Sequence, residues 1–120
     1  MGGDGNVIQY IEAGLRATGM RGKVLADNIA NMNTPDFRRR AVEFEKILAQ
    51  AVEDGDLEAL RNFEIDVTRP MDTPVGPNGN DVDLDREVGE MIKNSAIRKT
   101  YMRLLGKVYD QMEIAIQTQR

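Results

Sequence analysis

Apolar residues recur at alternating steps of three and four through the first quarter of the chain, and this spacing constrains the fold more than any other feature. The residues in the pattern are Ile8, Ile11, Leu15, Thr18, Gly22, Leu25, Ile29 and Met32. The spacing places them on one side of an α-helix and is typical of a coiled coil. Gly14, Gly19 and Gly22 each cost such a helix about 1 kcal/mol relative to alanine. We therefore expect a helix over residues 7–33 that depends on a partner, which its small residues allow to come close.

A second long helix is predicted at the other end of the chain, over residues 83–118. At 1.5 Å per residue it would be roughly 50 Å long. Two neighbouring apolar stripes run along it. One stripe contains Leu84, Val88, Met91, Ser95, Met102, Leu105, Tyr109, Met112 and Ile116, and the other contains Ile97, Tyr101, Leu104 and Val108. Because the first helix can cover only one stripe, we expect the other to contact a second copy of the chain or a different protein.

Residues 34–82 are predicted to form an insert between the two helices. Pro35 disfavours helical geometry at the preceding residue and should end the first helix. A short helix is expected over 42–52, followed by a turn and one more helical turn over 57–61. Alternating apolar and polar residues over 63–68 predict a short strand. The proline- and glycine-rich stretch that follows, residues 69–80, is predicted to be a loop with a tight turn at Asn78-Gly79.

The predicted fold is therefore mainly α and forms a single domain. Its long N- and C-terminal helices pair as a coiled coil, with a small irregular or β-containing insert between them.

Composition narrows the function. The sequence has no cysteine and no histidine, which removes thiolate chemistry, the commonest general base and the commonest metal ligand. A net charge of −4 argues against nucleic acid as a partner. The run Asp81-Val82-Asp83-Leu84-Asp85 looks like a calcium loop, but Arg86 and Ile92 stand where that loop requires glycine and glutamate. Helix capping is the favoured interpretation, and we expect no enzymatic activity, cofactor, metal or small-molecule substrate.

Two groups of polar residues have more than one interpretation. Arg38-Arg39-Arg40 is a basic run that we interpret as a solvated segment or an ion-pair site between subunits, rather than a phosphate or lipid site. Asn28 and Asn31 either cap the end of the first helix or lie buried between helices, where an amide can fix the register.

The stretch from Leu25 to Pro35 reads Leu-Ala-Asp-Asn-Ile-Ala-Asn-Met-Asn-Thr-Pro and closely resembles the N-terminal motif of flagellar rod, hook and hook-junction proteins. Within that family, the stretch from Gly79 to Glu87 and the short chain are similar to proximal-rod members. The motif usually continues with glycine and tyrosine, where this chain has Asp36 and Phe37.

The resemblance implies a proximal rod subunit, which is a structural component of the bacterial flagellar basal body that self-assembles into the torque-transmitting rod. The implied partners are other copies of the chain, other flagellar rod proteins, membrane-ring and rod-adaptor proteins, and the flagellar type III export apparatus. The implied location is periplasmic, reached without a cleaved signal peptide. The helices of such proteins pack into a shared coiled-coil tube.

We expect two sets of residues to carry assembly. The packing set is Ile8, Ile11, Leu15, Leu25, Ile29, Met32, Val88, Met91, Ile97, Tyr101, Met102, Leu104, Leu105, Val108, Tyr109 and Met112. The register and motif set is Asn28, Asn31, Asn33, Thr34 and Pro35. The alternatives are another axial subunit, which the stretch Val82-Asp83-Leu84-Asp85 disfavours, and a soluble coiled-coil binding module such as an export chaperone or adaptor.

Overall fold

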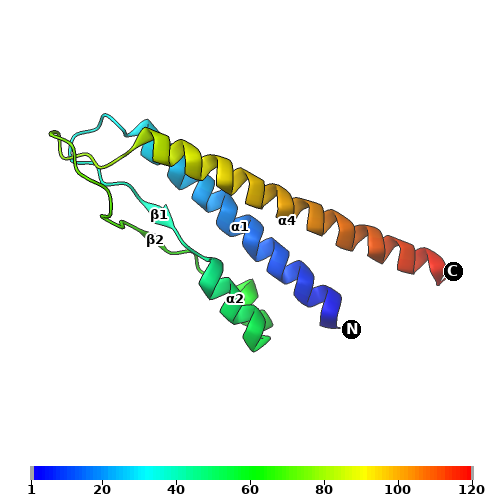
Figure 1. Ribbon diagram of the computed structural model, residues 1–120. Helices are drawn as coiled ribbons and strands as arrows, with labels where there is room; N and C mark the ends of the chain where they lie inside the picture. The colour runs from blue at the N-terminus through cyan, green and yellow to red at the C-terminus, as the bar shows by residue number, and fades with distance from the viewer. Residues whose placement is uncertain (1, 120) are drawn as a thin grey trace.

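Two long helices form an antiparallel hairpin that runs the length of the molecule (Figure 1). The computed structural model describes residues 2–119. Helix α1 covers Gly2–Ala30 and helix α4 covers Leu84–Thr118. The closed end of the hairpin is the end where α1 finishes and α4 begins, and the molecule measures 68 × 25 × 15 Å. The prediction of a mainly α fold with long terminal helices is confirmed, and none of the helices within residues 2–119 has the length and apolar character needed to cross a membrane.

The bounds of α1 differ from the predicted 7–33, because the helix begins at Gly2 and ends at Ala30. The backbone then makes turns over residues 31–36, so Met32 lies outside the helix and is 38% exposed. The side chain of Asn31 explains the early end. Its Nδ2 donates to the carbonyl of Asp27 at 2.8 Å and so satisfies one of the last helical acceptors. The predicted position of Met32 in the helical packing stripe was therefore wrong.

The insert contains two short strands and two short helices. Strand β1 is Ala41–Val42 and strand β2 is Val67–Thr68, and they pair antiparallel with Ala41 opposite Thr68. Helix α2 covers Glu45–Asp54 and helix α3 covers Leu57–Arg61. The predicted helical turn over 57–61 is confirmed. The predicted helix over 42–52 starts late because the chain first pairs as β1, and the predicted strand over 63–68 is reduced to its last two residues.

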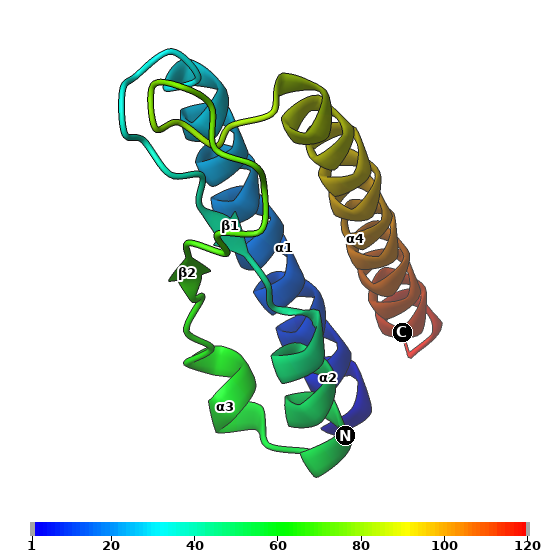
Figure 2. The same cartoon turned by 60° about the vertical axis from the view of Figure 1, so that its left-hand side comes forward.

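Helix α1 lies between α4 on one side and the insert on the other (Figure 2). The buried core forms around it. Its members are Ile11, Ala13, Ala17, Val24, Val42, Phe44, Leu48, Ala51, Leu60 and Tyr101. Only Tyr101 in this cluster comes from α4, so most of the core joins α1 to the insert. The guanidinium of Arg21 also stacks over the Phe44 ring, 4.7 Å from its centroid.

Small residues on α1 lie opposite large side chains on α4. A Cβ on Gly19 would lie 2.9 Å from Nη1 of Arg98, and a Cβ on Gly22 would lie 3.6 Å from Nδ2 of Asn94. The glycines that weaken α1 as a helix therefore make room for its partner, as the sequence suggested. The groups that approach are long side chains rather than the partner backbone.

Candidate assembly interface

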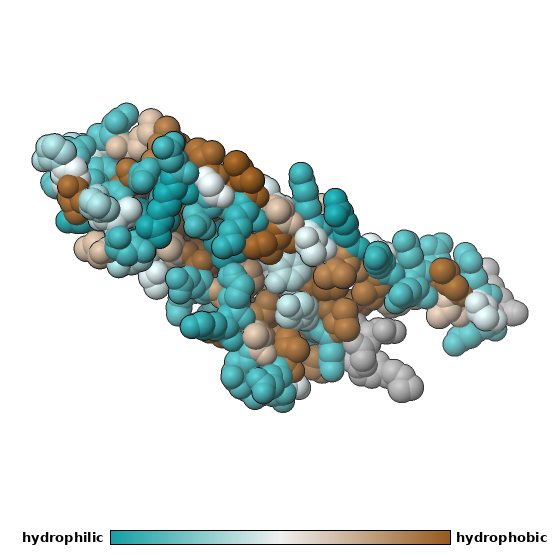
Figure 3. Space-filling view, in the orientation of Figure 1, coloured by the Kyte–Doolittle hydropathy of each residue, from teal (hydrophilic) through white to brown (hydrophobic). Residues whose placement is uncertain are grey.

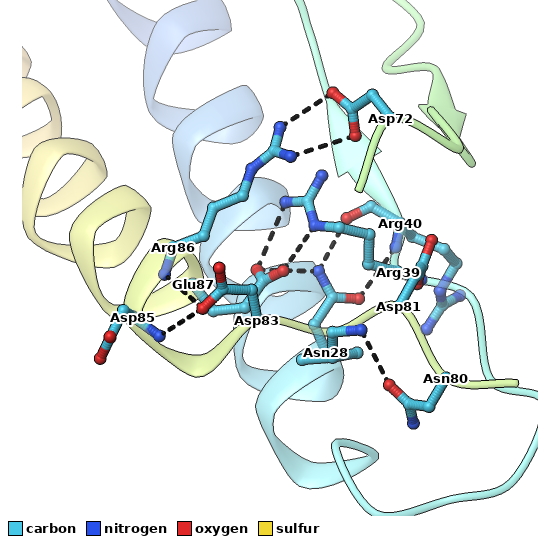
Figure 4. Close-up of polar contacts among 11 residues, drawn as sticks. Asn28, Arg39, Arg40, Asp72, Asn80, Asp81, Asp83, Asp85, Arg86 and Glu87 are labelled. Atoms are coloured by element: carbon cyan, nitrogen blue, oxygen red, sulfur yellow. Dashed lines mark hydrogen bonds and ion pairs between the residues drawn. The ribbon is translucent and has the colours of Figure 1, made fainter. Parts of the chain in front are cut away.

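A buried polar network joins α1, the insert and α4 at the closed end of the hairpin (Figure 4). Asn28 of α1 is fully buried at its centre. Its Nδ2 donates to the Arg40 carbonyl at 2.8 Å and to Glu87 Oε2 at 3.1 Å. Its Oδ1 accepts from the Arg40 backbone N–H at 2.9 Å. A buried amide whose donors and acceptor are used in this way holds the three segments in one register.

A buried ion pair completes this closed-end network. Arg39 Nε donates to Glu87 Oε1 at 2.5 Å, and the two side chains are 3% and 0% exposed. Asp81 Oδ1 accepts from the Arg39 backbone N–H at 2.5 Å. The interpretation of the basic run as solvated or as an ion-pair site between subunits is therefore wrong for Arg39, which is paired inside the chain. Its partner is 48 residues away in the sequence, so no local pattern reveals the pair.

The two asparagines divide the roles that the sequence left open. Asn28 is the buried residue between helices, and Asn31 is the residue that caps the end of α1. Asn80 supports the same turn, because its Nδ2 donates to the carbonyls of Asn31 and Thr34 at 2.8 and 2.7 Å. Asn33, Thr34 and Pro35 are themselves exposed in this turn.

Asp36, which stands where the family motif has glycine, adopts the backbone conformation that glycine favours. Asp36 adopts the left-handed conformation, with φ of 63°, at the position where the motif has glycine. Aspartate tolerates this region better than most residues. The Asp36 backbone N–H also donates to the Asn78 carbonyl at 2.9 Å, and Gly79, with φ of 78°, lies against Asp36 without room for a side chain. The predicted turn at Asn78-Gly79 thus packs against the turn at Asp36 and accepts its backbone hydrogen bond.

The aspartates before α4 have separate tasks. Asp83 is the N-cap, and its Oδ1 accepts from the backbone N–H groups of Asp85 and Arg86 at 3.1 and 3.4 Å. Asp81 points away toward Arg39. Helix capping is therefore observed at the position where a calcium loop was considered. Within residues 2–119 no group of three or more His, Cys, Asp or Glu side chains is arranged to hold a metal ion.

The side of α4 that faces α1 differs from both predicted stripes. Its least exposed residues are Glu87, Met91, Asn94, Ile97, Tyr101, Leu105 and Val108. This row mixes members of the two stripes, and it excludes Leu104, which is 41% exposed. On α1, Ile11 and Leu25 are buried, while Ile8, Leu15 and Ile29 are half-buried.

Sequence reasoning missed two polar residues of this row. Glu87 belongs to the closed-end network, and Asn94 donates from Nδ2 to the Thr18 carbonyl at 2.9 Å and accepts from Arg21 Nε at 2.8 Å. The signal that would have found them is a spacing of seven. Glu87, Asn94, Tyr101 and Val108 follow one another at this interval, which is the heptad rule applied without requiring apolar residues.

The part of α4 outside its packed row, its outer face, carries apolar residues that are exposed in the described chain. Val88, Met102, Tyr109 and Met112 are 42%, 57%, 50% and 37% exposed. Every residue from 109 to 119 is exposed. In Figure 3 brown apolar side chains interrupt the hydrophilic surface along the edge formed by α4. The chain therefore presents an apolar helix face along much of its length.

Three titratable groups have shifted pKa values because of their neighbours, and one of them is Arg86, whose pKa is raised by its hydrogen bond to Asp72. Burial raises the pKa of the Tyr101 hydroxyl to about 12, and the nearby Tyr10 adds to the shift. The two rings meet edge to face with centroids 6.0 Å apart. At the surface, a hydrogen bond from Arg86 lowers the pKa of Asp72. Each of these shifts arises from packing or from a surface ion pair.

Known proteins are similar to this chain over most of its sequence. Residues 12–38 match the family model for flagella basal body rod protein. Flagellar basal body rod protein FlgB of Bacillus subtilis (strain 168) is 32% identical over 98 residues, covering 72% of this chain and 74% of the relative. FlgB of Borrelia hermsii is 28% identical over 115 residues, covering 81% and 85%. FlgB of Yersinia enterocolitica is 28% identical over 116 residues, covering 82% and 85%.

The match to the family model contains Asn28 and most of the α1 face that packs on α4. The matches to the three relatives extend over 72–82% of the chain. The resemblance to flagellar rod proteins is confirmed, and the chain belongs to the FlgB family of flagellar basal body rod proteins.

Proposed function

We propose that the chain is a structural, non-enzymatic subunit of the bacterial flagellar basal body rod, where it assembles with copies of itself and with other rod proteins. The observation that carries the proposal, together with family membership, is the division of α4 into a covered and an uncovered part. One row of residues packs on α1, and apolar residues outside that row, which include Met102 and Tyr109, are exposed. An apolar face of this length on one chain is the expected feature of a subunit whose neighbours cover it.

The division assigns different tasks to the predicted packing residues. Ile11, Tyr101 and Leu105 belong to the core or pack against it, and Leu25 is buried, so in this scheme they stabilise the fold of the single chain. The exposed members of the predicted set form contacts between subunits; they are Met32, Val88, Met102, Leu104, Tyr109 and Met112. In this scheme the closed-end network around Asn28 keeps the two helices from sliding when torque passes along them.

The family resemblance supports a more specific placement. We infer that the subunit belongs to the proximal rod in the periplasm, next to membrane-ring and rod-adaptor proteins. It would reach this position through the flagellar type III export apparatus without a cleaved signal peptide. The glycines of α1 and the exposed α4 face fit this route, because a chain that completes its packing only on assembly remains easy to unfold beforehand.

Circular dichroism over a wide concentration range, paired with sedimentation velocity, tests the proposal. A rod subunit should gain helicity and mass together as concentration rises, because the outer face of α4 becomes covered. Deletion of the gene from a motile strain should abolish swimming, and the wild-type gene should restore it. Full helicity in a monomer at every concentration, with swimming unaffected by the deletion, would instead indicate a self-sufficient binding module.

A further inference from the structure

An acidic surface surrounds the junction of α2 and α3. Glu53, Asp54, Asp56 and Glu58 are all exposed there. No lysine or arginine occurs between residues 47 and 60. Within the described part of the chain, none of the four carboxylates belongs to an ion pair. This acidic surface is therefore uncompensated in the single chain.

An apolar hollow lies beside the acidic surface. It has a volume of about 450 Å³ and opens between the first turns of α1 and the two short helices. Its apolar lining is Val7, Tyr10, Ala49, Val52, Leu57 and Leu60. Val52 and Leu57 are 45% and 37% exposed at its edge. Exposed apolar residues bordered by charges of one sign are the composition of a docking surface rather than of a solvated one.

A basic surface of similar design lies on the middle of α4. Lys93, Lys99, Arg103 and Lys107 are all exposed there, and no aspartate or glutamate occurs between residues 91 and 109. Within residues 2–119 none of these four basic side chains forms an ion pair.

The basic surface also contains exposed apolar residues. Lys99, Arg103 and Lys107 are spaced four apart, so they line one side of the helix. Met102 and Leu104, the neighbours of Arg103 in the sequence, are 57% and 41% exposed and border this line of charges on opposite sides. The α4 surface therefore pairs positive charge with apolar area, as the acidic surface pairs negative charge with apolar area.

These two surfaces cannot meet within one chain. Helix α1 lies between α4 and the insert, so α2 and α3 are on the far side of α1 from α4 (Figure 2). Their opposite charges are consequently available only to another molecule. A second copy of the chain supplies both the matching charge and the matching apolar residues.

We propose that the acidic surface of one copy docks on the basic surface of a second copy, with Val52 and Leu57 against Met102. The inference rests on the proposed self-assembly and names the contact that it uses. Because the two surfaces are different, each docked pair leaves one of each kind free, so further copies add head to tail. Contacts of this type produce open helical filaments unless the rotation closes a ring. Opposite charges steer the encounter, and the apolar residues supply the buried area.

A charge swap tests this contact in the full chain. One variant carries Lys99→Glu and Arg103→Glu, and the other carries Glu53→Lys and Asp54→Lys. Each variant alone then keeps one charged surface while the other is neutralised, and self-association in low salt should weaken about tenfold or more. An equal mixture should recover association, because the intact acidic surface of the first variant can dock on the intact basic surface of the second. Sedimentation velocity measures the association, and circular dichroism verifies that each variant keeps its helices.

The control is a charge reversal outside both surfaces. Lys23→Glu with Arg69→Glu changes the net charge as much as the first variant, and both residues are exposed. This control should associate as the wild type does. Unchanged association of the two test variants, or loss of association without recovery in the mixture, would overturn the proposal. The proposed rod function would survive that result, because it depends on wild-type assembly and on swimming of the complemented strain.

Cysteine pairs test the same contact without altering charge. The chain has no cysteine of its own, so Val52→Cys in one preparation and Met102→Cys in another are the only thiols in a mixture. Oxidation should give a disulfide-linked dimer from the mixture in higher yield than from either variant alone. Val88→Cys serves as the matched α4 partner outside the basic surface, and it should give little dimer with Val52→Cys. Equal yields with Met102→Cys and Val88→Cys would contradict the proposed docking.

Discussion

The ring of Tyr101 lies so close to Gly14 that a Cβ on the glycine would overlap the ring atom Cζ. This contact joins α4 to the centre of α1. Because the Tyr101 ring fits only beside a residue without a side chain, the contact sets the position of α4 along α1. Gly14 would weaken α1 as an isolated helix, but its missing side chain makes the space that the Tyr101 ring of α4 occupies.

Gly14→Ala should destabilise the hairpin by about 1–3 kcal/mol despite the higher helix propensity of alanine, because the methyl group forces the Tyr101 ring out of its position. Gly106→Ala is the matched control, since no atom lies within 4 Å of a Cβ placed there. It should stabilise the chain by about 1 kcal/mol. Urea titration followed by circular dichroism measures both. A stabilising Gly14→Ala would show that the close contact with Tyr101 does not constrain the fold.

Glu87→Gln should cost about 3–5 kcal/mol, because it leaves the Arg39 guanidinium buried without a countercharge. Asp72→Asn is the control at an exposed pair. Asp72 Oδ2 lies 3.0 Å from Arg86 Nη2, and both side chains are at least one-third exposed. That change should cost much less than Glu87→Gln, because solvent screens an exposed ion pair. Equal losses in the two variants, measured by thermal unfolding, would contradict the assigned role of the buried pair.

Asn28→Asp should cost about 3 kcal/mol or more, because it replaces an amide donor by a carboxylate beside Glu87 Oε2 and the Arg40 carbonyl. Asn33→Asp makes the same substitution in the same motif at an exposed position, and it should change stability by no more than about 0.5 kcal/mol. Hydrogen exchange at the N–H of Arg40, which donates to Asn28, should become faster in the first variant only. Protection retained in Asn28→Asp would argue against a central role for this amide.

The sequence predicted the two long helices because their apolar periodicity extends over many turns and depends on local spacing alone. The Asp83 cap and the helical turn over 57–61 could be predicted for the same reason, since capping and turn chemistry are local. The pairing of β1 with β2 could not be predicted from local sequence, because Ala41 and Thr68 meet only after the insert has folded back on itself.

The facing row of α4 was predicted only in part, because the prediction assumed that a packed face is apolar. Glu87 and Asn94 occupy that face and are satisfied by partners on α1 and the insert. Arg39 was predicted to lie at the surface, because burying an arginine without a partner is costly. Its burial becomes possible only because Glu87, far away in the sequence, pairs with it. The roles of the exposed α4 residues remain predictions.

The pKa of Tyr101 predicts how stability changes in alkaline solution. Its value in the folded chain is about 12, above the ordinary value of 10, because burial penalises the phenolate. The unfolded chain therefore loses this proton first, so the contribution of the neutral hydroxyl is complete below pH 10 and is lost as the pH rises through 12. Tyr101→Phe should remove this part of the decline between pH 10 and 12. Parallel stability curves for the wild type and Tyr101→Phe over that range would contradict the shift.

Leu105→Asp and Met102→Asp separate folding of the hairpin from assembly of subunits. Leu105 packs against the core, so a carboxylate there should cost about 3 kcal/mol or more and reduce the helicity of the isolated chain. Met102 is 57% exposed, and its replacement should leave the unfolding free energy within about 1 kcal/mol of the wild type. Both variants should fail to restore swimming to a deletion strain, the first because it does not fold and the second because its outer face no longer packs on a neighbour. Normal swimming with Met102→Asp would show that the outer face of α4 at this position is not an assembly contact, while normal swimming with Leu105→Asp would contradict the hairpin as the functional fold.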